Sequence, residues 1–171
     1  IKTNSNNPEV DTGAGYAVTF NNNGWTFNGG NYSGENAAGT SNLAFTFQAA
    51  EGYFDVIKYS GNSEFNAGNP AGSEGRQLTH SLGTKVGFAI IKNITNNSDW
   101  MCFHSGMVAS SGLSSTLRLN TDAGQVATNF IFYGNNGPND GSVFGNLGNF
   151  EQSNMTGNDY VAYLFAEDQG R

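Results

Sequence analysis

The chain of 171 residues contains few charges, and this shortage narrows its possible partners. Lys, Arg, Asp and Glu make up 12% of the residues, and seven basic side chains stand against fourteen acidic ones, for a net charge of −7. A nucleic-acid surface requires a cluster of Lys and Arg, and so does a basic anchor on a membrane. We therefore expect neither nucleic acid nor a membrane as a partner.

Cysteine, long apolar runs and helical periodicity are also scarce. The single cysteine, Cys102, excludes an internal disulfide framework. No apolar run approaches the roughly 18 residues that a membrane-spanning helix needs. No segment repeats its apolar residues at the spacing of an amphipathic helix, so a helical fold is not expected.

The sequence is instead rich in glycine, aromatic residues and short apolar runs that end in Gly- and Asn-rich turns. It contains 24 Gly and 13% aromatic residues, whereas disordered chains are poor in aromatics. Short runs closed by turn residues are typical of strands. The predicted strands are residues 16–20, 43–47, 53–59, 86–92, 100–104, 116–119, 129–133, 142–144 and 160–165. They predict an all-β fold, an antiparallel β-sandwich or lectin-like jelly roll.

One of these strands is apolar on both faces. Residues 86–92 read VGFAIIK, which predicts a central strand paired on both sides, with Phe88 or Ile90 buried. Lys and Pro, which protect the edges of sheets, are rare within the predicted strands. We therefore expect poorly protected edges that are open to pairing with another chain.

Two parts of the chain resemble each other. Ala44–Phe47 reads AFTF and Ala162–Phe165 reads AYLF, while GWTF at residues 24–27 matches GSVF at residues 141–144. The offset of about 118 residues corresponds to a whole domain rather than a short solenoid repeat.

The match predicts that residues 1–50 are the closing part of a preceding unit, or an N-terminal assembly segment, and that residues 51–171 are a complete β-sandwich unit. It also predicts that Phe47 and Phe165 face inward from equivalent strands. Alternatively, the two copies pair as neighbouring strands within one sandwich.

From residue 52 onward, a series of motifs follows in a specific order. The motifs are GYFDVIKYSGN, LTHSLGTKVGFAIIKN, DWMCFHSGM, STLRLNTDAG, SVFGNLG and TGNDYVAYLFAED. In this order they resemble a domain that occurs, often in tandem, in predicted tail-fibre and other virion structural proteins of marine bacteriophages. The resemblance covers residues 24–168. It implies an all-β fold related to lectin-type sandwiches and a place on a virus particle, and it implies no catalytic residue.

Residues suited to catalysis or metal binding are few. Cys102 and His104 share a face of a predicted strand, but a zinc site needs two more ligands and only His80 is at hand. The acidic residues are scattered in turns, and no predicted strand carries the close carboxylate pair that glycoside hydrolysis requires. The turns at 120–124 and 135–141 offer oxygen ligands for calcium, without the spacing of an EF-hand. We expect no catalytic residue, no metal site and no cofactor.

Four aromatic residues lie in or beside predicted loops, namely Trp25, Tyr32, Tyr133 and Phe150. Aromatic faces with nearby Asn and Asp suit sugar rings and their hydroxyl groups. These four residues are therefore candidates for glycan binding. The same side chains could equally pack under their loops or against a neighbouring subunit.

These observations favour a non-enzymatic virion structural module, part of a fibre, an appendage or a capsid decoration. Such a module would be assembled in the host cytoplasm, exposed on the particle, and packed against copies of itself or other virion proteins. A glycan-binding module that recognises the host surface is the alternative, and a polysaccharide depolymerase is a weaker one.

Overall fold

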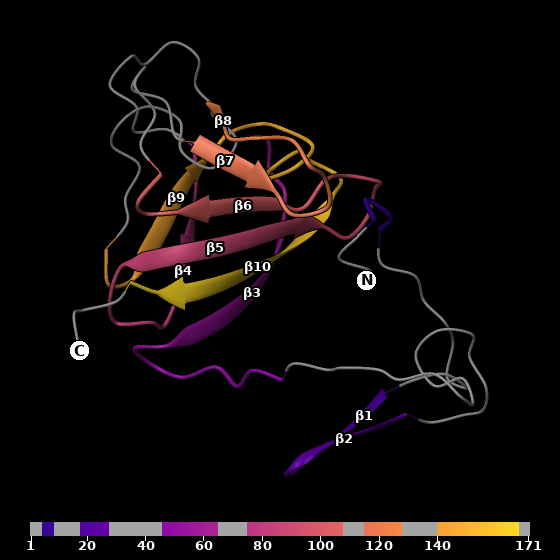
Figure 1. Cartoon of the computed structure of the whole chain (residues 1–171), viewed down its shortest axis with the longest axis vertical. Coiled ribbons are helices and arrows are strands. Elements are labelled where there is room, and N and C mark those ends of the chain that lie inside the picture. Colours follow the sequence, from indigo (N-terminus) through magenta and orange to yellow (C-terminus); the bar gives the residue numbers. More distant parts are fainter. Residues whose placement is uncertain are drawn as a thin grey trace. The chain divides into compact units, whose positions relative to one another are not determined.

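The structure, a computed structural model, describes residues 5–8, 18–27, 46–64, 75–107, 115–127 and 140–167. The chain divides into two compact units, one formed by residues 1–9 and 48–171 and the other by residues 10–47. Every regular element among the described residues is a β-strand (Figure 1). The all-β prediction is therefore confirmed.

The larger unit contains a six-stranded antiparallel sheet and a separate pair of strands. The order in the large sheet is β3-β10-β5-β6-β7-β8. These strands are β3 (Phe54–Ser60), β10 (Asp159–Ala166), β5 (Val86–Asn93), β6 (Met101–His104), β7 (Ser115–Arg118) and β8 (Val126–Ala127). The pair consists of β4 (Arg76–Thr79) and β9 (Val143–Leu147).

The register between β4 and β9 shifts by one residue beside Gly145. Gly145 has a φ of 85°, in the left-handed region that glycine adopts without steric cost, as in a β-bulge.

The β4–β9 pair covers one face of the large sheet, which we call the inner face. Figure 1 shows the large sheet in front of these two strands. The rings of Phe103 on β6 and Phe144 on β9 lie 5.5 Å apart, so side chains from both layers meet in one core. The core residues are Tyr59, Leu78, Leu82, Val86, Ala89, Ile91, Met101, Phe103, Phe144, Leu147, Tyr160, Ala162 and Leu164. This two-layer packing is a β-sandwich; its jelly-roll variant stays a prediction.

The prediction for residues 86–92 is confirmed in part. β5 is a central strand, paired with β10 on one side and β6 on the other. Phe88 and Ile90, however, are half-buried, whereas their neighbours Ala89 and Ile91 on the other face of the strand are fully buried. The prediction chose the wrong face, because a strand that is apolar on both faces carries no signal of which one is covered.

The prediction that Phe47 and Phe165 share an inward environment is wrong. Phe47 is 58% exposed, and the described end of its segment, residues 46–47, is not a strand. Phe165 lies on β10 but faces away from the core, because Leu164 occupies the inward position beside it. Residues 43–45 lie outside the described residues.

The smaller unit contains one described hairpin. β1 (Val18–Asn21) pairs with β2 (Gly24–Phe27) across a two-residue turn. Asn21 Nδ2 donates a hydrogen bond of 3.0 Å to Thr26 Oγ1, and Trp25 Nε1 donates one of 3.3 Å to Thr46 Oγ1. The sequence predicts that residues 1–50 are the closing part of a preceding repeat. That assignment stays a prediction.

Candidate functional site

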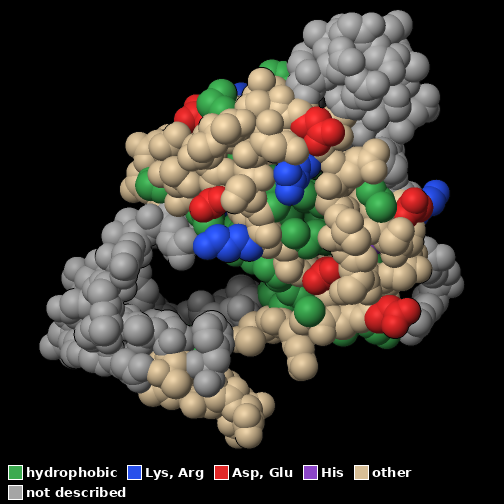
Figure 2. All heavy atoms as spheres, turned by 180° about the vertical axis from the view of Figure 1, so that it is seen from behind, with side chains coloured by type: hydrophobic (Ala, Val, Ile, Leu, Met, Phe, Trp, Pro, Cys, Tyr) green, Lys and Arg blue, Asp and Glu red, His purple; other side chains and the backbone are tan. Residues whose placement is uncertain are grey.

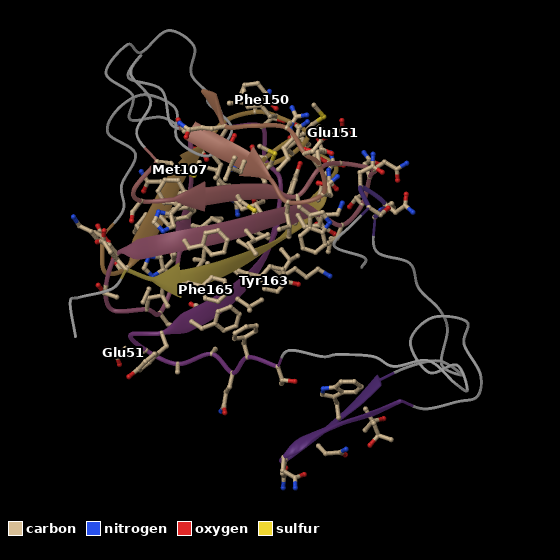
Figure 3. The ribbon with its side chains drawn as sticks, in the orientation of Figure 1. Glu51, Met107, Phe150, Glu151, Tyr163 and Phe165 are labelled. Carbon is tan, nitrogen blue, oxygen red and sulfur yellow. The ribbon has the colours of Figure 1, made fainter. Side chains whose placement is uncertain are left out.

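The face of the six-stranded sheet that points away from β4 and β9, here the outer face, is the best candidate for a functional surface. Because the strands are in register, its side chains form rows that run across the sheet. The first row is Phe54, Phe165, Phe88 and His104; the second is Val56, Tyr163, Ile90, Cys102 and Leu117; the third begins with Lys58, Val161 and Lys92. Figure 3 labels Tyr163 and Phe165 on β10, near the middle of the first two rows.

The first row is a continuous series of aromatic contacts. The ring centroids of Phe54 and Phe165 lie 4.9 Å apart, and those of Phe165 and Phe88 lie 5.5 Å apart. Phe88 is followed by His104 at 6.4 Å. All three pairs are tilted, the arrangement that aromatic quadrupoles favour. The row is therefore an ordered series across four strands, in which Phe54 is buried, Phe165 and Phe88 are half-buried and His104 is exposed.

The second row is apolar and partly open to solvent. Val56 is 43% exposed at one end and Leu117 is 39% exposed at the other, and between them Ile90 and Tyr163 are half-buried. Tyr53, next to β3, is 62% exposed. Cys102, between Ile90 and Leu117, is buried, so the exposed apolar side chains lie towards the two ends of the row. Apolar side chains exposed together on a folded protein often mark a binding surface.

The third row is partly covered by the N-terminal segment of the chain. Trp100 Nε1 donates a hydrogen bond of 3.0 Å to the carbonyl oxygen of Ser5. The carbonyl oxygen of Asn6 accepts two more, at 3.2 Å from Lys92 Nζ and at 2.7 Å from the amide of Ser98. We call Lys92, Ser98 and Trp100 the Lys92–Trp100 site.

The Lys92–Trp100 site holds a buried cation. Lys92 is fully buried, its Nζ lies 5.9 Å from the centre of the Trp100 ring, and it also donates a hydrogen bond of 2.9 Å to the carbonyl of Ser98. Burial lowers the pKa of Lys92 below its ordinary value, against the opposing attraction of Asp99. A buried ammonium group needs such acceptors, so the segment at residues 5–8 completes the site.

The edge of the large sheet at β3 is protected at its Phe54 end, where the expectation of an open edge does not hold; the rest of that expectation stays a prediction. The backbone N–H and C=O of Phe54 are both bonded to Ala50, and Asp55 Oδ1 accepts a hydrogen bond of 2.8 Å from the amide of Val56. Lys58 is the next exposed residue along this edge. Backbone groups that are already paired, followed by an exposed lysine, disfavour the addition of a further strand.

Asp55 also ties this edge to the loop after β4. Its Oδ2 accepts hydrogen bonds from the amide of Ser81 at 2.7 Å and from the Ser81 hydroxyl at 2.9 Å. Burial raises the pKa of Asp55, but the hydrogen bonds from Ser81 and Val56 outweigh it and hold the pKa below its ordinary value. The carboxylate is therefore ionised at neutral pH.

The structure describes two of the four predicted glycan-binding residues. Trp25 is half-buried in the hairpin of the smaller unit, and Phe150 is half-buried in the loop after β9 in the larger unit. The backbone of Phe150 is held in that loop, where its carbonyl accepts hydrogen bonds from Ser153 and Asn154. Tyr32 and Tyr133 lie outside the described residues. A glycan site formed by these four residues stays a prediction.

The residues considered for nucleophilic or zinc chemistry have other roles in the structure. Cys102 and His104 share the outer face as expected, but burial raises the pKa of the Cys102 thiol to about 11, so it is protonated at neutral pH. His104 Nδ1 accepts a hydrogen bond of 2.9 Å from Gly106, and His80 is buried beside β9. Within the described ranges, no group of three or more His, Cys, Asp or Glu side chains is placed to hold a metal ion.

Sequence reasoning did not find the outer face. One signal was available in the sequence: residues 86–92 and 160–165 carry apolar side chains on both faces of their strands. A strand that contributes to a single core needs apolar side chains on one face only. The contacts of residues 5–8 had no sequence signal, since they are made by main-chain carbonyls.

Comparisons with known proteins place the chain in a family. Residues 1–171 match the family described as a domain of unknown function (DUF7483), so the chain belongs to that family, and the match runs through both compact units. No curated protein and no solved structure matches the chain. In the part of the chain that is described, no helix is long and apolar enough to cross a membrane.

Proposed function

We propose that this member of the family is a non-enzymatic assembly module that binds further copies of itself through the outer face of its large sheet. The observation that carries the proposal is the pair of apolar rows on that face, with Val56 and Leu117 exposed at the two ends of one row.

The chemistry of the outer face suits a protein surface better than a sugar. Between Val56 and Leu117 lie Tyr163, Ile90 and Cys102, which offer few hydrogen-bonding groups. Sugar sites combine an aromatic face with several polar groups placed for hydroxyls. An apolar core of this kind, with polar groups at its rim, is typical of interfaces between protein subunits.

Charge favours a second copy as the partner. Each copy has a net charge of −7, so two copies repel unless their contact surfaces are low in acidic groups. None of the side chains named in the three rows of the outer face is a carboxylate, and the third row carries Lys58. Asp159, the next outer-face position on β10, accepts a hydrogen bond of 2.6 Å from the Ser60 hydroxyl. On the opposite side of the molecule, acidic and basic side chains are scattered over the surface (Figure 2).

The resemblance to tail-fibre and other virion structural proteins supports a more specific setting for this assembly. We propose that the module is part of a virion, in a fibre, an appendage or a capsid decoration, where it contacts copies of itself or other virion proteins. Glycan binding at the host surface is the alternative, and it has less support because it rests on Trp25, Tyr32, Tyr133 and Phe150 alone.

The assembly proposal is tested by adding charge to the outer face. We expect the wild-type chain to form dimers or larger species as its concentration rises, and Val56→Lys/Leu117→Lys to weaken this association at least tenfold. The matched control is Gln77→Lys/Thr79→Lys, which adds two lysines at exposed positions of β4 and should leave association unchanged. Sedimentation velocity over a concentration series measures the effect, and circular dichroism checks folding.

Two outcomes would overturn the proposal. In the first, the wild-type chain stays monomeric at the highest soluble concentration. In the second, the outer-face variant associates as strongly as the control. A monomer that binds defined oligosaccharides on a glycan array, and loses that binding with Trp25→Ala or Phe150→Ala, would establish the alternative.

A further inference from the structure

The Lys92–Trp100 site captures a segment of chain through its main chain. Three donors, Trp100 Nε1, Lys92 Nζ and the amide of Ser98, bind two consecutive carbonyl oxygens, those of Ser5 and Asn6. The residues at positions 6 and 7 are exposed, so their side chains contribute little to the docking. The same segment of any other copy would make the same three hydrogen bonds.

We propose that residues 5–8 are exchanged between copies, so that the segment of one copy docks at the Lys92–Trp100 site of the next. This inference rests on the proposed assembly function, because it needs copies that are already held close together. It assigns to the site a peptide ligand, the N-terminal segment of a second copy of the chain.

The connection between the segment and the sandwich permits such an exchange. Residues 10–47 form a compact unit of their own, so the docked segment is joined to Gln48 only through that unit. No described strand of the large sheet has to be broken when the segment leaves. Exchange of an identical element at the end of a long connection is a low-cost route to association.

The hydrogen bonds of the Lys92–Trp100 site favour a filled site over an empty one. If the segment leaves, the buried Lys92 loses one of its two carbonyl acceptors and the Trp100 indole loses its own. Polar groups that lose their protein partners must find water or stay unpaired, and unpaired buried groups are costly. A segment from a second copy restores all of these bonds.

Concentration decides which segment fills the site. A tether keeps a copy's own segment at an effective concentration on the order of millimolar, so in dilute solution each site holds its own segment. Copies packed through the outer face bring a second segment to a similar local concentration. We therefore expect exchange only under conditions in which the copies assemble.

Disulfide trapping in the full chain distinguishes exchange from docking within one copy. Asn7 and Asn97 are exposed and flank the 2.7 Å hydrogen bond between Ser98 and Asn6. One copy carries Asn7→Cys and the other Asn97→Cys, and both keep Cys102, whose thiol is buried and protonated at neutral pH. At concentrations that give assembly, mild oxidation of the mixture should yield the mixed disulfide between the two copies. In the control, Asp122→Cys, at an exposed position elsewhere, replaces Asn97→Cys, and we expect at least tenfold less of the disulfide there.

The double variant Asn7→Cys/Asn97→Cys, oxidised at high dilution, should close within one chain. If it closes but the assembled mixture gives no mixed disulfide above the control, the segment stays in its own copy and the exchange is overturned. If it does not close, residues 5–8 do not occupy the site, and the exchange is again overturned.

A third arm separates this inference from the proposed function. Val56→Lys/Leu117→Lys in both copies should abolish the mixed disulfide together with the assembly. If assembly and the mixed disulfide both persist in that variant, the outer face is the wrong contact, although the exchange stands. If assembly persists in the wild type without the mixed disulfide, the exchange fails and the assembly function stands.

Discussion

The two faces of the six-stranded sheet are built from the same strands but differ in what covers them. On β10, Tyr160, Ala162 and Leu164 point to the inner face and are fully buried, while Val161, Tyr163 and Phe165 alternate with them and are half-buried on the outer face. Both sets are mainly apolar, so composition does not separate them. The β4–β9 pair covers one face, and the other keeps part of its apolar surface open to solvent.

The inner face is closed at one end by a polar network. The rings of Tyr59 and Tyr160 stack at 5.1 Å, and their hydroxyls donate to the carbonyls of Ser153 at 2.6 Å and Glu151 at 3.0 Å. The amide of Met155 donates to the Tyr160 hydroxyl at 2.9 Å. This network attaches the loop before β10 to the core, and such satisfied networks specify a single packing.

Asparagine has a structural role at the same end. Asn93, fully buried, donates a hydrogen bond of 2.8 Å to the carbonyl of Glu151 and accepts bonds of 2.9 Å from the amides of Thr95 and Asn96. Asn158 lies beside it and accepts a bond of 2.7 Å from the Asn96 side chain. Part of the high asparagine content therefore holds loops to the core, beyond the turn-forming role that sequence reasoning assigned to it.

The largest expected difference between the faces concerns adjacent residues of β5. Ile91→Ala removes a fully buried side chain from the core, and we expect it to lower the free energy of unfolding by about 2–5 kcal/mol. Ile90→Ala on the outer face leaves a position that solvent can already reach, so we expect a loss of about 1 kcal/mol. Urea denaturation of the two variants measures the difference, and equal losses would show that the outer face is as closed as the core.

Sequence reasoning predicted the strands with apolar signals and failed where that signal was absent. β5, β6, β7 and β10 were found because their residues are apolar, whereas β4, which reads RQLT, was missed, as were the short strands β2 and β8. The prediction for Phe47 failed because short strand-like motifs resemble one another whether or not their surroundings match.

The candidate site was less accessible to sequence reasoning than the fold. The rows of the outer face depend on strand order and register, which bring Val56, Tyr163, Ile90 and Leu117 together from four strands. Neither can be derived from a single sequence without a turn that fixes them. The sequence alone shows Asp55 as a polar residue within a predicted strand. The hydrogen bond that it accepts from the edge amide of Val56 is visible only in the structure.

A smaller difference is expected between two asparagines that lie four residues apart. Asn93→Ala leaves the amides of Thr95 and Asn96 without their acceptor and removes one of the two hydrogen bonds to the carbonyl of Glu151, so we expect a loss of about 1–3 kcal/mol. Asn97→Ala, at an exposed position just beyond the same turn, should change stability by no more than about 0.5 kcal/mol. Thermal unfolding of both variants makes the comparison, and a harmless Asn93→Ala would mean that water replaces the side chain.

The smallest expected effect is the pH dependence that Asp55 gives to the edge of the sheet. Its pKa in the folded chain is below the ordinary value of 3.8, so the folded state favours the ionised form. The stability that this provides is fully present above the ordinary value and is lost as the pH falls through the lower, folded value.

Asp55→Asn should therefore flatten the decline of the melting temperature between about pH 5 and pH 2, the range over which a carboxylate with a lowered pKa takes up its proton. Ser81→Ala removes one of the two hydrogen bonds from Ser81 and should flatten it less. Melting temperatures at a series of pH values test both variants. A decline as steep in Asp55→Asn as in the wild type would show that the carboxylate does not stabilise this edge, and would reopen β3 as a site for strand addition.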